Sequence, residues 1–551
     1  MVSFFIIKIQ IRNPIVFSPE DTNTPCSTGD PLDDTRSIID RDIARLRNNI
    51  RGLEDSIRGV EDNIRVLNSR RNELSPTSRL PAEILCNIFS LTILLSPGHP
   101  KSWTSFSQVS QRWRSLALNS PELWTNIPFS YPRWAQEMLI RSKMAKLTIR
   151  SDFIEIPKSI EAIRLCLCEM NRVETIDIAH EIPGLKEIFQ TFPKSAPQLR
   201  TLRIESYSLR SSGTAFWIHE GFLYDTERLQ HVELINCEIS WDSRLLTGLT
   251  RLTLEVEDSS KTNSSINQFL HALQRMPALI ELRLKDSIPD DSEGPSAYPD
   301  VDLPFLRVLN ISSSVGPLTV VLRHITIPHS AILKLTCKGR QSTLIDFSNF
   351  LSVLFTKFLL SLVFRTLRLR GFDRHFEFYF LTTATIRDCL PLSQFQVELV
   401  FTWPYGLGHV KALTCLFDAM SLPFLTQLQI STFDYIDSQT WVKTFGTLPL
   451  LERVCVQGYT TKSFLEALLY KTKTAEKSKT AYRIVSFPEL RYICLEETNF
   501  GTRSLSVDML LDCLMERCER DAEVQVLRLD GCSYISSDDV ARLKEIVVDV
   551  T

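Results

Sequence analysis

Apolar residues recur from Ile39 onward in alternating steps of four and three positions, and mostly polar residues lie between them. This heptad pattern predicts a coiled-coil helix over residues 36–76. Isoleucine at a with leucine at d favours a parallel two-stranded coil, so the chain can pair with a second copy through residues 39–74. Packing of the helix on its own chain, or no pairing at all, stays open. The a residues are Ile43, Ile50, Ile57 and Ile64, and the d residues are Leu46, Leu53, Val60, Leu67 and Leu74.

Residues 1–35 lack this pattern, and we expect them to form a disordered leader. The first apolar run, "MVSFFIIKIQI", is interrupted by Lys8 and Gln10 and is followed by no cleavage site. Neither a signal peptide nor a membrane anchor is therefore expected. Residues 18–36 are polar, with three prolines and five acidic residues. A segment of this composition cannot bury enough apolar surface to fold.

A short segment, residues 80–124, concentrates large apolar side chains. Pro81 and Glu83 suit the first turn of a helix, and the apolar residues of 85–95 surround most of its circumference. A second, amphipathic helix is predicted over residues 106–117, and the "SPE" that follows caps a third short helix. Three such short helices cannot shelter all these side chains, so some must meet a partner or the core of a larger helical domain.

The sequences "LPAEILCNIFSL" and "VSQRWRSLALNSPELW" within this segment resemble the F-box. The F-box is the adaptor-binding motif of substrate receptors in Skp-cullin-F-box ubiquitin ligases, and the resemblance covers residues 78–127. It implies that the segment binds a Skp-type adaptor and, through it, a cullin scaffold. Two differences are Ser110, where cysteine is frequent, and a long "LLSPGHPKSW" connector. The residues that match packing or adaptor-gripping positions are Leu80, Pro81, Ile84, Leu85, Ile88, Phe89, Val109, Trp113, Leu116, Leu123 and Trp124.

The rest of the chain repeats an L-x-x-L-x-L pattern at loose intervals, with thirteen approximate copies starting between Met144 and Val524. In each copy the alternation directs two apolar residues inward from a short strand and leaves the residue between them outward. Because one copy cannot bury its own leucines, the copies must stack into a curved parallel sheet backed by helices and loops. This predicts an α/β solenoid over residues 140–545 that resembles irregular leucine-rich repeats. The whole arrangement resembles fungal-type F-box-like proteins.

The outward positions of these copies are mostly polar, as a protein-binding surface requires. In "FRTLRLRGFDRH", the side chains of Arg365, Arg368 and Arg370 are predicted to point from one strand toward the same face. Their guanidinium groups suit carboxylates or phosphates of a target protein, while solvated arginines balanced by neighbouring acids are the alternative. The outward residues are Thr148, Asp177, Arg203, Glu233, Thr253, Arg283, Asn310, Lys334, Arg368, Gln429, Cys455, Cys494 and Arg528.

Composition narrows the possible functions further. The 62 basic and 65 acidic residues nearly cancel, so no overall field favours nucleic acid or a membrane as a partner. The 13 scattered cysteines favour a reducing compartment, cytoplasmic or nuclear. No phosphate-binding loop, nucleophile elbow or zinc-type spacing occurs, so we expect no cofactor, no metal and no enzymatic activity.

These features together predict a substrate-recognition subunit of a Skp-cullin-F-box ubiquitin ligase that binds an unknown target protein. Two alternatives stay open. One is a leucine-rich interaction scaffold that works outside any ligase. The other is an enzyme hidden in the irregular residues 372–424, which would show a polar pocket with strongly perturbed titrating groups.

Overall fold

The computed structural model describes residues 31–95, 105–129, 132–151, 157–193, 195–207, 215–219, 221–257, 265–289, 298–339, 344–360, 362–372, 375–382, 396–402, 411, 414–416, 419, 422–432, 436–469, 486–502 and 505–551. The chain divides into two compact units. One comprises residues 1–87 and 106–115, and the other comprises residues 88–105 and 116–551. The predicted leader therefore lies almost entirely outside the described residues.

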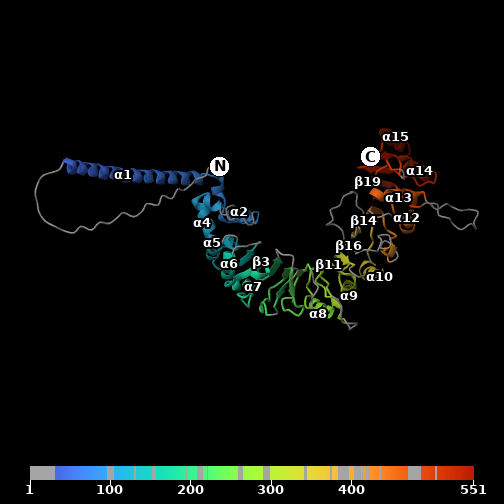
Figure 1. The fold of residues 1–551 in the computed structure, drawn as a ribbon, viewed down its shortest axis with the longest axis horizontal. Coiled ribbons are helices and arrows are strands. Elements are labelled where there is room, and N and C mark those ends of the chain that lie inside the picture. The colour runs from blue at the N-terminus through green and yellow to red at the C-terminus, as the bar shows by residue number, and fades with distance from the viewer. Residues whose placement is uncertain are drawn as a thin grey trace, which may run out of the picture. The chain divides into compact units, whose positions relative to one another are not determined.

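The first unit contains one long helix, α1 (Pro31–Glu73), labelled in Figure 1. Arg70 and Arg71 lie in its last turn, where cations interact favourably with the helix dipole. The helix ends at Glu73, so Leu74 lies beyond it, and the prediction that Leu74 continues the heptad seam is wrong. Among the described residues, no helix is both long enough and apolar enough to cross a membrane.

Among its described residues, the segment that follows contains two α-helices and three 3-10 turns. The predicted second helix is interrupted because the chain forms a 3-10 turn first and starts a new helix after Ser110, whose hydroxyl accepts a hydrogen bond from the Trp113 amide at 3.1 Å. The predicted third helix is a single 3-10 turn. The elements are η1 (Pro76–Arg79), α2 (Ala82–Leu95), η2 (Ser105–Gln108), α4 (Gln111–Asn119) and η3 (Pro121–Trp124).

The second unit is built on one sheet of 17 strands within the described ranges, and all but one of them run in the same direction. Neighbouring strands follow one another along the sheet in the order β1 (Asn126–Pro128), β2 (Leu147–Ser151), β3 (Val173–Glu181), β4 (Thr201–Tyr207), β6 (His231–Ile235), β8 (Arg251–Glu255), β9 (Glu281–Lys285), β11 (Val308–Ser314), β13 (Ile332–Lys338), β16 (Val397–Thr402), β15 (His375–Leu381), β14 (Thr366–Phe372), β17 (Gln427–Thr432), β18 (Arg453–Gln457), β19 (Tyr492–Glu496), β20 (Val526–Asp530) and β21 (Asp549–Val550).

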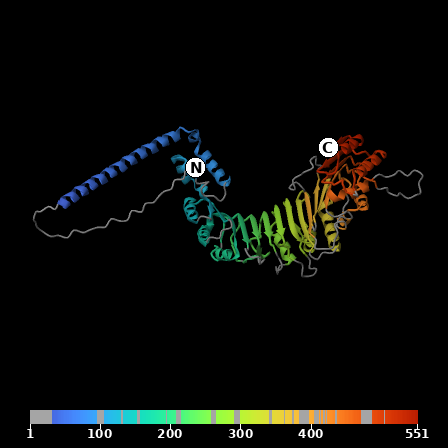
Figure 2. The ribbon, with the colours of Figure 1, turned by 45° about the horizontal axis from the view of Figure 1, so that its top comes forward.

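Each of the thirteen predicted repeat copies forms a strand of this sheet, from β2 to β20. The alternation of the sequence decides which side chains enter the core. In β4, Leu202 and Ile204 are fully buried, and in β6, Val232 and Leu234 are as well. The predicted mixed α/β class with a curved, mostly parallel sheet is therefore confirmed (Figure 2).

Helices cover one face of the sheet and close the core. Contacts join α7 to β3 and β4, α9 to β11 and β13, and α13 to β18. Two short parallel pairs, β5 (Phe216–Ile218) with β7 (Cys237–Ile239) and β10 (Val301–Asp302) with β12 (Ile325–Thr326), lie outside the large sheet. The helices are α5 (Pro132–Arg141), α6 (Pro157–Leu167), α7 (Ile182–Phe189), α8 (Ile266–Gln274), α9 (Val315–His324), α10 (Leu344–Leu354), α12 (Ser438–Thr444), α13 (Thr461–Leu468), α14 (Val507–Cys518) and α15 (Ser537–Ile546).

Among the described strands, the regular succession of parallel repeats is interrupted at β15 and β16. Strand β13 pairs with β16 rather than with β14, and β15 runs antiparallel between β16 and β14. Parallel pairing resumes between β14 and β17. The inserted strands bury Phe376, Phe378 and Phe380 against the helix side, where Phe401 also meets Phe347 of α10 at a ring distance of 4.7 Å.

Candidate functional site

Helix α2 presents an apolar stripe that the rest of the described chain leaves open to solvent. Ile84, Ile88, Leu91 and Leu95 are 45%, 40%, 57% and 82% exposed. Steps of four, three and four positions place them along one side of the helix, because an α-helix turns about 100° per residue. Single exposed leucines are ordinary, but a continuous row of four marks an interaction surface. We call these four residues the α2 stripe.

The other side of α2 faces the interior of the protein. Leu85, Phe89 and Ile93 repeat every four residues on that side, and all three are buried. The helix therefore divides into a packing face and a free face, and the alternation of these two faces explains why the sequence is apolar around most of the circumference.

One arginine ties α4 to the chain that precedes α2. Arg112 donates from Nη2 to the carbonyl oxygen of Leu80 at 2.7 Å and from Nη1 to that of Ser78. The hydroxyl of Ser78 in turn donates to the carbonyl oxygen of Asn72, in the last turn of α1, at 2.5 Å. These bonds connect the end of α1 with the start of α4 through polar groups that have fixed directions.

Trp124 closes the segment as a buried anchor. Its Nε1 donates to the carbonyl oxygen of Ala117 in α4 at 2.7 Å, and the guanidinium of Arg141 in α5 lies 4.5 Å from the ring centroid. The indole therefore satisfies its polar atom while its faces pack, which is the arrangement a buried tryptophan requires.

A second candidate surface lies on the face of the sheet opposite the helices. Strand register aligns one outward residue from each strand into a row across the sheet, which we call the central row. Its members from β2 to β16 are Arg150, Asp177, Arg203, Glu233, Thr253, Arg283, Asn310, Lys334 and Glu398, and it continues through Tyr379, Arg368, Gln429, Cys455, Cys494 and Arg528.

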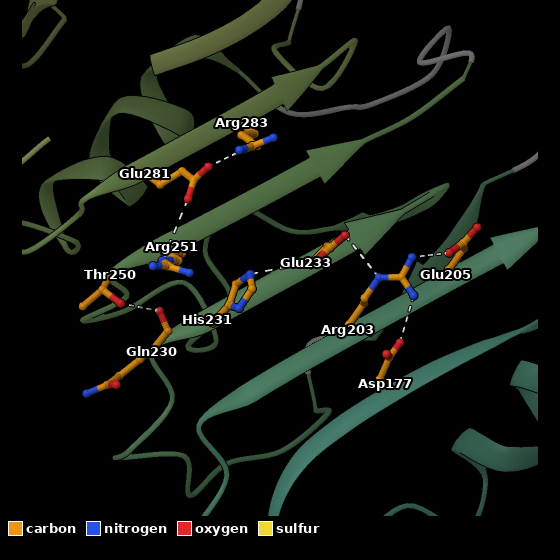
Figure 3. Close-up of polar contacts among 10 residues, drawn as sticks. All are labelled: Asp177, Arg203, Glu205, Gln230, His231, Glu233, Thr250, Arg251, Glu281 and Arg283. Carbon is orange, nitrogen blue, oxygen red and sulfur yellow. Dashed lines mark hydrogen bonds and ion pairs between the residues drawn. The ribbon is translucent and has the colours of Figure 1, made fainter. Parts of the chain in front are cut away.

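Opposite charges alternate over the first four members of the central row and neutralise one another (Figure 3). Arg203 donates from Nη1 to Asp177 at 2.8 Å and from Nε to Glu233 at 3.1 Å, and it also contacts Glu205. Arg150 reaches the other oxygen of Asp177 at 3.0 Å. Although burial acts to lower it, the carboxylates of Asp177 and Glu233 hold the pKa of Arg203 above its ordinary value.

The network continues beside the central row with more exposed groups. Glu281 of β9 lies 3.8 Å from Arg251 and also bonds Arg283, the central-row residue of its own strand. The side chains of both arginines are about half exposed. His231 lies 3.9 Å from Glu233, but burial lowers the pKa of this imidazole, so it is neutral at neutral pH. Between β6 and β9 the sheet therefore presents accessible cations and carboxylates side by side.

Residues 77–130 match the F-box-like family model. Among curated proteins, none matches the chain. Two solved structures resemble it weakly. A TLR13–ssRNA13 complex shares 13% identity over 74% of this chain and 45% of that chain, with a TM-score of 0.29. A complex of Rad7 and Elc1 in yeast shares 11% identity over 79% of this chain and 96% of that chain, with a TM-score of 0.25. The chain thus spans less than half of the first structure, and similarity at this level does not identify a function.

The F-box resemblance of the sequence is confirmed by this match, but the eleven F-box residues play two different parts. Four of them have side chains that are at most 4% exposed, so in this structure they pack inside the chain. These four are Leu85, Phe89, Leu123 and Trp124. The exposed residues are Pro81, Ile84, Ile88 and Val109, and Leu80, Trp113 and Leu116 are half-buried. For these seven, adaptor contact stays a prediction.

Two exposed members of the α2 stripe were not among those eleven residues. Leu91 and Leu95 continue the spacing of Ile84 and Ile88 along the free face of α2. The sequence carried this signal as an i, i+4, i+7, i+11 series. It was hidden because Leu91 belongs to a run of neighbouring apolar residues.

The three arginines at and before β14 do not form one array. Arg368 is buried, and its Nε donates to Gln429 at 2.6 Å, so it stabilises the contact between β14 and β17. Arg365 precedes the strand and is out of phase with the other two, so the prediction that all three share a face is wrong. Arg370 lies in phase with Arg368 and is half-buried. A target contact at Arg365 or Arg370 stays a prediction.

Titrating groups in the described chain behave as parts of the fold. Burial raises the pKa of the Cys166 and Cys513 thiols to about 12, which removes the thiolate that a reactive cysteine needs. Within the described ranges, no group of three or more His, Cys, Asp or Glu side chains is placed to hold a metal ion.

Proposed function

We propose that the chain is a substrate-recognition subunit of a Skp-cullin-F-box ubiquitin ligase. The α2 stripe carries the proposal. An F-box-like domain is present at residues 77–130, and the free face of its first helix exposes four large aliphatic side chains in a row. When a Skp-type adaptor covers this stripe, burial of apolar surface favours binding. The full burial of one exposed aliphatic side chain is worth about 1.5–3 kcal/mol, and each member of the stripe gains the share that corresponds to its exposed part.

The leucine-rich repeats hold the target protein in this proposal. Register aligns their outward residues into the central row, and between β6 and β9 this row contains the exposed cation Arg283, with Arg251 and the carboxylate of Glu281 beside it. A surface of mixed charge suits a folded protein partner with complementary charges better than a polyanion, because its own carboxylates repel phosphate groups.

Catalysis in this scheme is proximity. The receptor contributes no reacting group and raises the local concentration of the target's lysines at the charged conjugating enzyme. The receptor has to bind the adaptor and the target at the same time. The α2 stripe would bind the adaptor, and the outward face of the sheet would bind the target.

Purification tests the ligase assignment directly. Full-length chain co-expressed with a Skp-type adaptor and a cullin is expected to elute with both at equal stoichiometry in size-exclusion chromatography with light scattering. Elution with the adaptor but without the cullin would favour an interaction scaffold outside any ligase. Elution with neither would refute the adaptor assignment itself.

Substitution in the charged region of the sheet tests the target surface. The Arg251→Ala, Arg283→Ala double variant leaves Glu281 without either arginine partner, and we expect capture of target proteins to fall about tenfold or more. The measurement is quantitative mass spectrometry of proteins captured by the full chain. Arg244→Ala with Arg307→Ala, two exposed arginines outside the strands, is the matched control. If both variants retain every partner, this part of the sheet does not bind the target.

A further inference from the structure

Helix α1 exposes a complete apolar seam along its length. Every side chain from residue 35 to residue 68 is exposed, including all the seam positions. The exposed seam consists of Ile39, Ile43, Leu46, Ile50, Leu53, Ile57, Val60, Ile64 and Leu67, each between 39% and 64% exposed. A helix surrounded by water does not normally expose a row of nine large apolar side chains. None of the described residues covers this row.

The charged residues of α1 avoid the seam. Its ion pairs Arg58 with Asp55 at 3.6 Å and Arg65 with Asp62 at 2.7 Å lie at the b and f positions on the opposite side, and Arg65 also lies 3.8 Å from Glu61 at an e position. Charged residues also limit the seam, since the a positions before and after it are Arg36 and Arg71. The seam therefore has two defined ends about 42 Å apart, from the rise of 1.5 Å per residue over 28 steps.

A helix of this kind is poorly stable alone. Most of the stability of helices in proteins comes from packing of an apolar face, and the apolar face of α1 packs against none of the described residues over positions 35–68. Gly52 and Gly59 each weaken it by about 1 kcal/mol relative to alanine. Both glycines lie at the outward c position with nothing within 4 Å, so they leave the seam intact.

We propose that α1 forms a parallel two-stranded coiled coil with α1 of a second copy of the chain. A second copy is the occupant that matches the seam by construction, because its isoleucines and leucines repeat in the same register and stop at the same charged ends. A partner protein with a different repeat would leave part of the 28-step seam uncovered.

The distribution of residue types sets the orientation. Every a position between Ile43 and Ile64 is isoleucine, and leucine occupies three of the five d positions from Ile39 to Leu67. This segregation matches parallel dimers, in which a layers and d layers have different packing geometries, whereas antiparallel pairs mix a with d in each layer. The parallel arrangement also brings Asp42 at g of one chain beside Arg47 at e of the other, and neither has an ion pair within its own described chain.

Dimerisation through α1 makes the protein bivalent. The end of α1 is connected to the start of the F-box-like domain by the Ser78 and Arg112 hydrogen bonds. A parallel coil therefore places both F-box-like domains at the same end of the coil. If the proposed function holds, one assembly presents two adaptors and two target surfaces, and a target with two binding sites gains avidity.

Mass photometry and sedimentation of the full-length protein test the dimer. Wild-type protein is expected to be dimeric, and the Ile50→Glu, Ile57→Glu double variant is expected to dissociate at least 100-fold more readily, because four buried side chains of the coil become charged. The control is Ala44→Glu with Asn48→Glu, which adds the same charge at the b and f positions and should leave the dimer intact. A monomeric wild type, or a dimer unaffected by the seam variant, overturns the proposal.

Cross-linking tests the orientation. Ile43→Cys places one thiol per chain at the first a layer, so a parallel coil is expected to form a disulfide-linked dimer under mild oxidation beyond any formed by wild type. In a fully overlapping antiparallel coil the two introduced thiols would lie more than about 30 Å apart, by the same rise per residue. A dimer that forms no such link would overturn the parallel arrangement. Adaptor binding is measured on the same samples, so failure of the dimer and failure of the proposed function are distinguished.

Discussion

Replacing Ile84 and Ile88 with aspartate is expected to abolish binding of the Skp-type adaptor while the chain stays folded. Both side chains lie on the free face of α2 and are 45% and 40% exposed, so charge at these positions meets water in the unbound protein. In the complex the same two carboxylates would have to lie against the adaptor without partners. The cost therefore falls on the complex and spares the fold.

The expected size of this effect follows from the buried area. Each isoleucine loses about 1 kcal/mol of apolar burial, because it is already more than half covered in the free chain, and each buried carboxylate adds a desolvation cost of about 1–3 kcal/mol. Since about 1.4 kcal/mol is tenfold in affinity, the double variant should bind at least 100-fold more weakly. Titration by biolayer interferometry against the purified adaptor measures the dissociation constant.

Two further variants make the result interpretable. Ser90→Asp puts one charge on an exposed position of α2 about 120° from the stripe and should leave the affinity unchanged. Leu85→Asp buries a charge in the packing face and should lower the melting temperature of the domain. If Ile84→Asp, Ile88→Asp binds like wild type at an unchanged melting temperature, the α2 stripe is not the adaptor surface.

The repeated strands could be predicted because one local rule covers each of them. In every copy, two apolar residues flank one outward residue, so in a strand both apolar side chains point to the same face of the sheet. The next copy must lie alongside to complete the core on that face. Register followed as well: Asp177, Arg203 and Glu233 were predicted at equivalent outward positions and lie directly side by side. Thr148 is the exception, because β2 pairs with β3 two residues out of the predicted register, so that Thr148 lies opposite Thr175 and Arg150 lies opposite Asp177.

Partner choice between strands could not be predicted. The sequences of β15, "HFEFYFL", and β16, "VELVFT", alternate as strands do but lack the leucine pattern of the copies. Nothing local states that β16 pairs with β13, or that β15 runs antiparallel, because such pairing depends on contacts between residues far apart in the chain. The same reason explains Arg368, whose burial depends on Gln429 of a strand that lies 61 positions further along.

Burial also separates residues that the sequence treats alike. Ile84 and Leu85 are neighbours of similar size, and only the packing of the folded chain shows that Leu85 is internal and Ile84 is free. The resemblance to the F-box placed Ile84 and Leu85 in the same motif. A sequence motif shows which residue types recur at each position, but it does not show which side chains are buried in the folded chain. A variant chosen from sequence alone would have combined a folding defect with a binding defect.

A buried arginine near the C-terminal end was not identified from the sequence at all. Arg517 of α14 is 1% exposed, and its guanidinium donates to the carbonyl oxygens of Ser486 and Phe487, both at 2.9 Å, and of Leu490 at 3.4 Å. Burial lowers its pKa from the ordinary value to about 10, so it remains charged at neutral pH. Phe487 adopts a positive φ of 59°, which is costly for a bulky residue and must be held by its surroundings. Arg517 therefore fixes the turn that leads into β19.

Replacing Arg517 with alanine is accordingly expected to lower the free energy of unfolding of the C-terminal repeats by about 3–5 kcal/mol, since three buried carbonyl groups lose their donor and the turn at Phe487 loses its support. Arg517→Lys should recover little of this, because an ammonium group cannot reproduce the planar fork. Hydrogen exchange of β18 and β19, read together with denaturant unfolding, measures the loss.

Arg542→Ala is the control, because that arginine bonds Asp508 at 2.9 Å at the surface with its side chain 52% exposed. We expect this surface substitution to leave the stability nearly unchanged. Equal effects of the two alanine variants would show that Arg517 contributes no more than a surface ion pair.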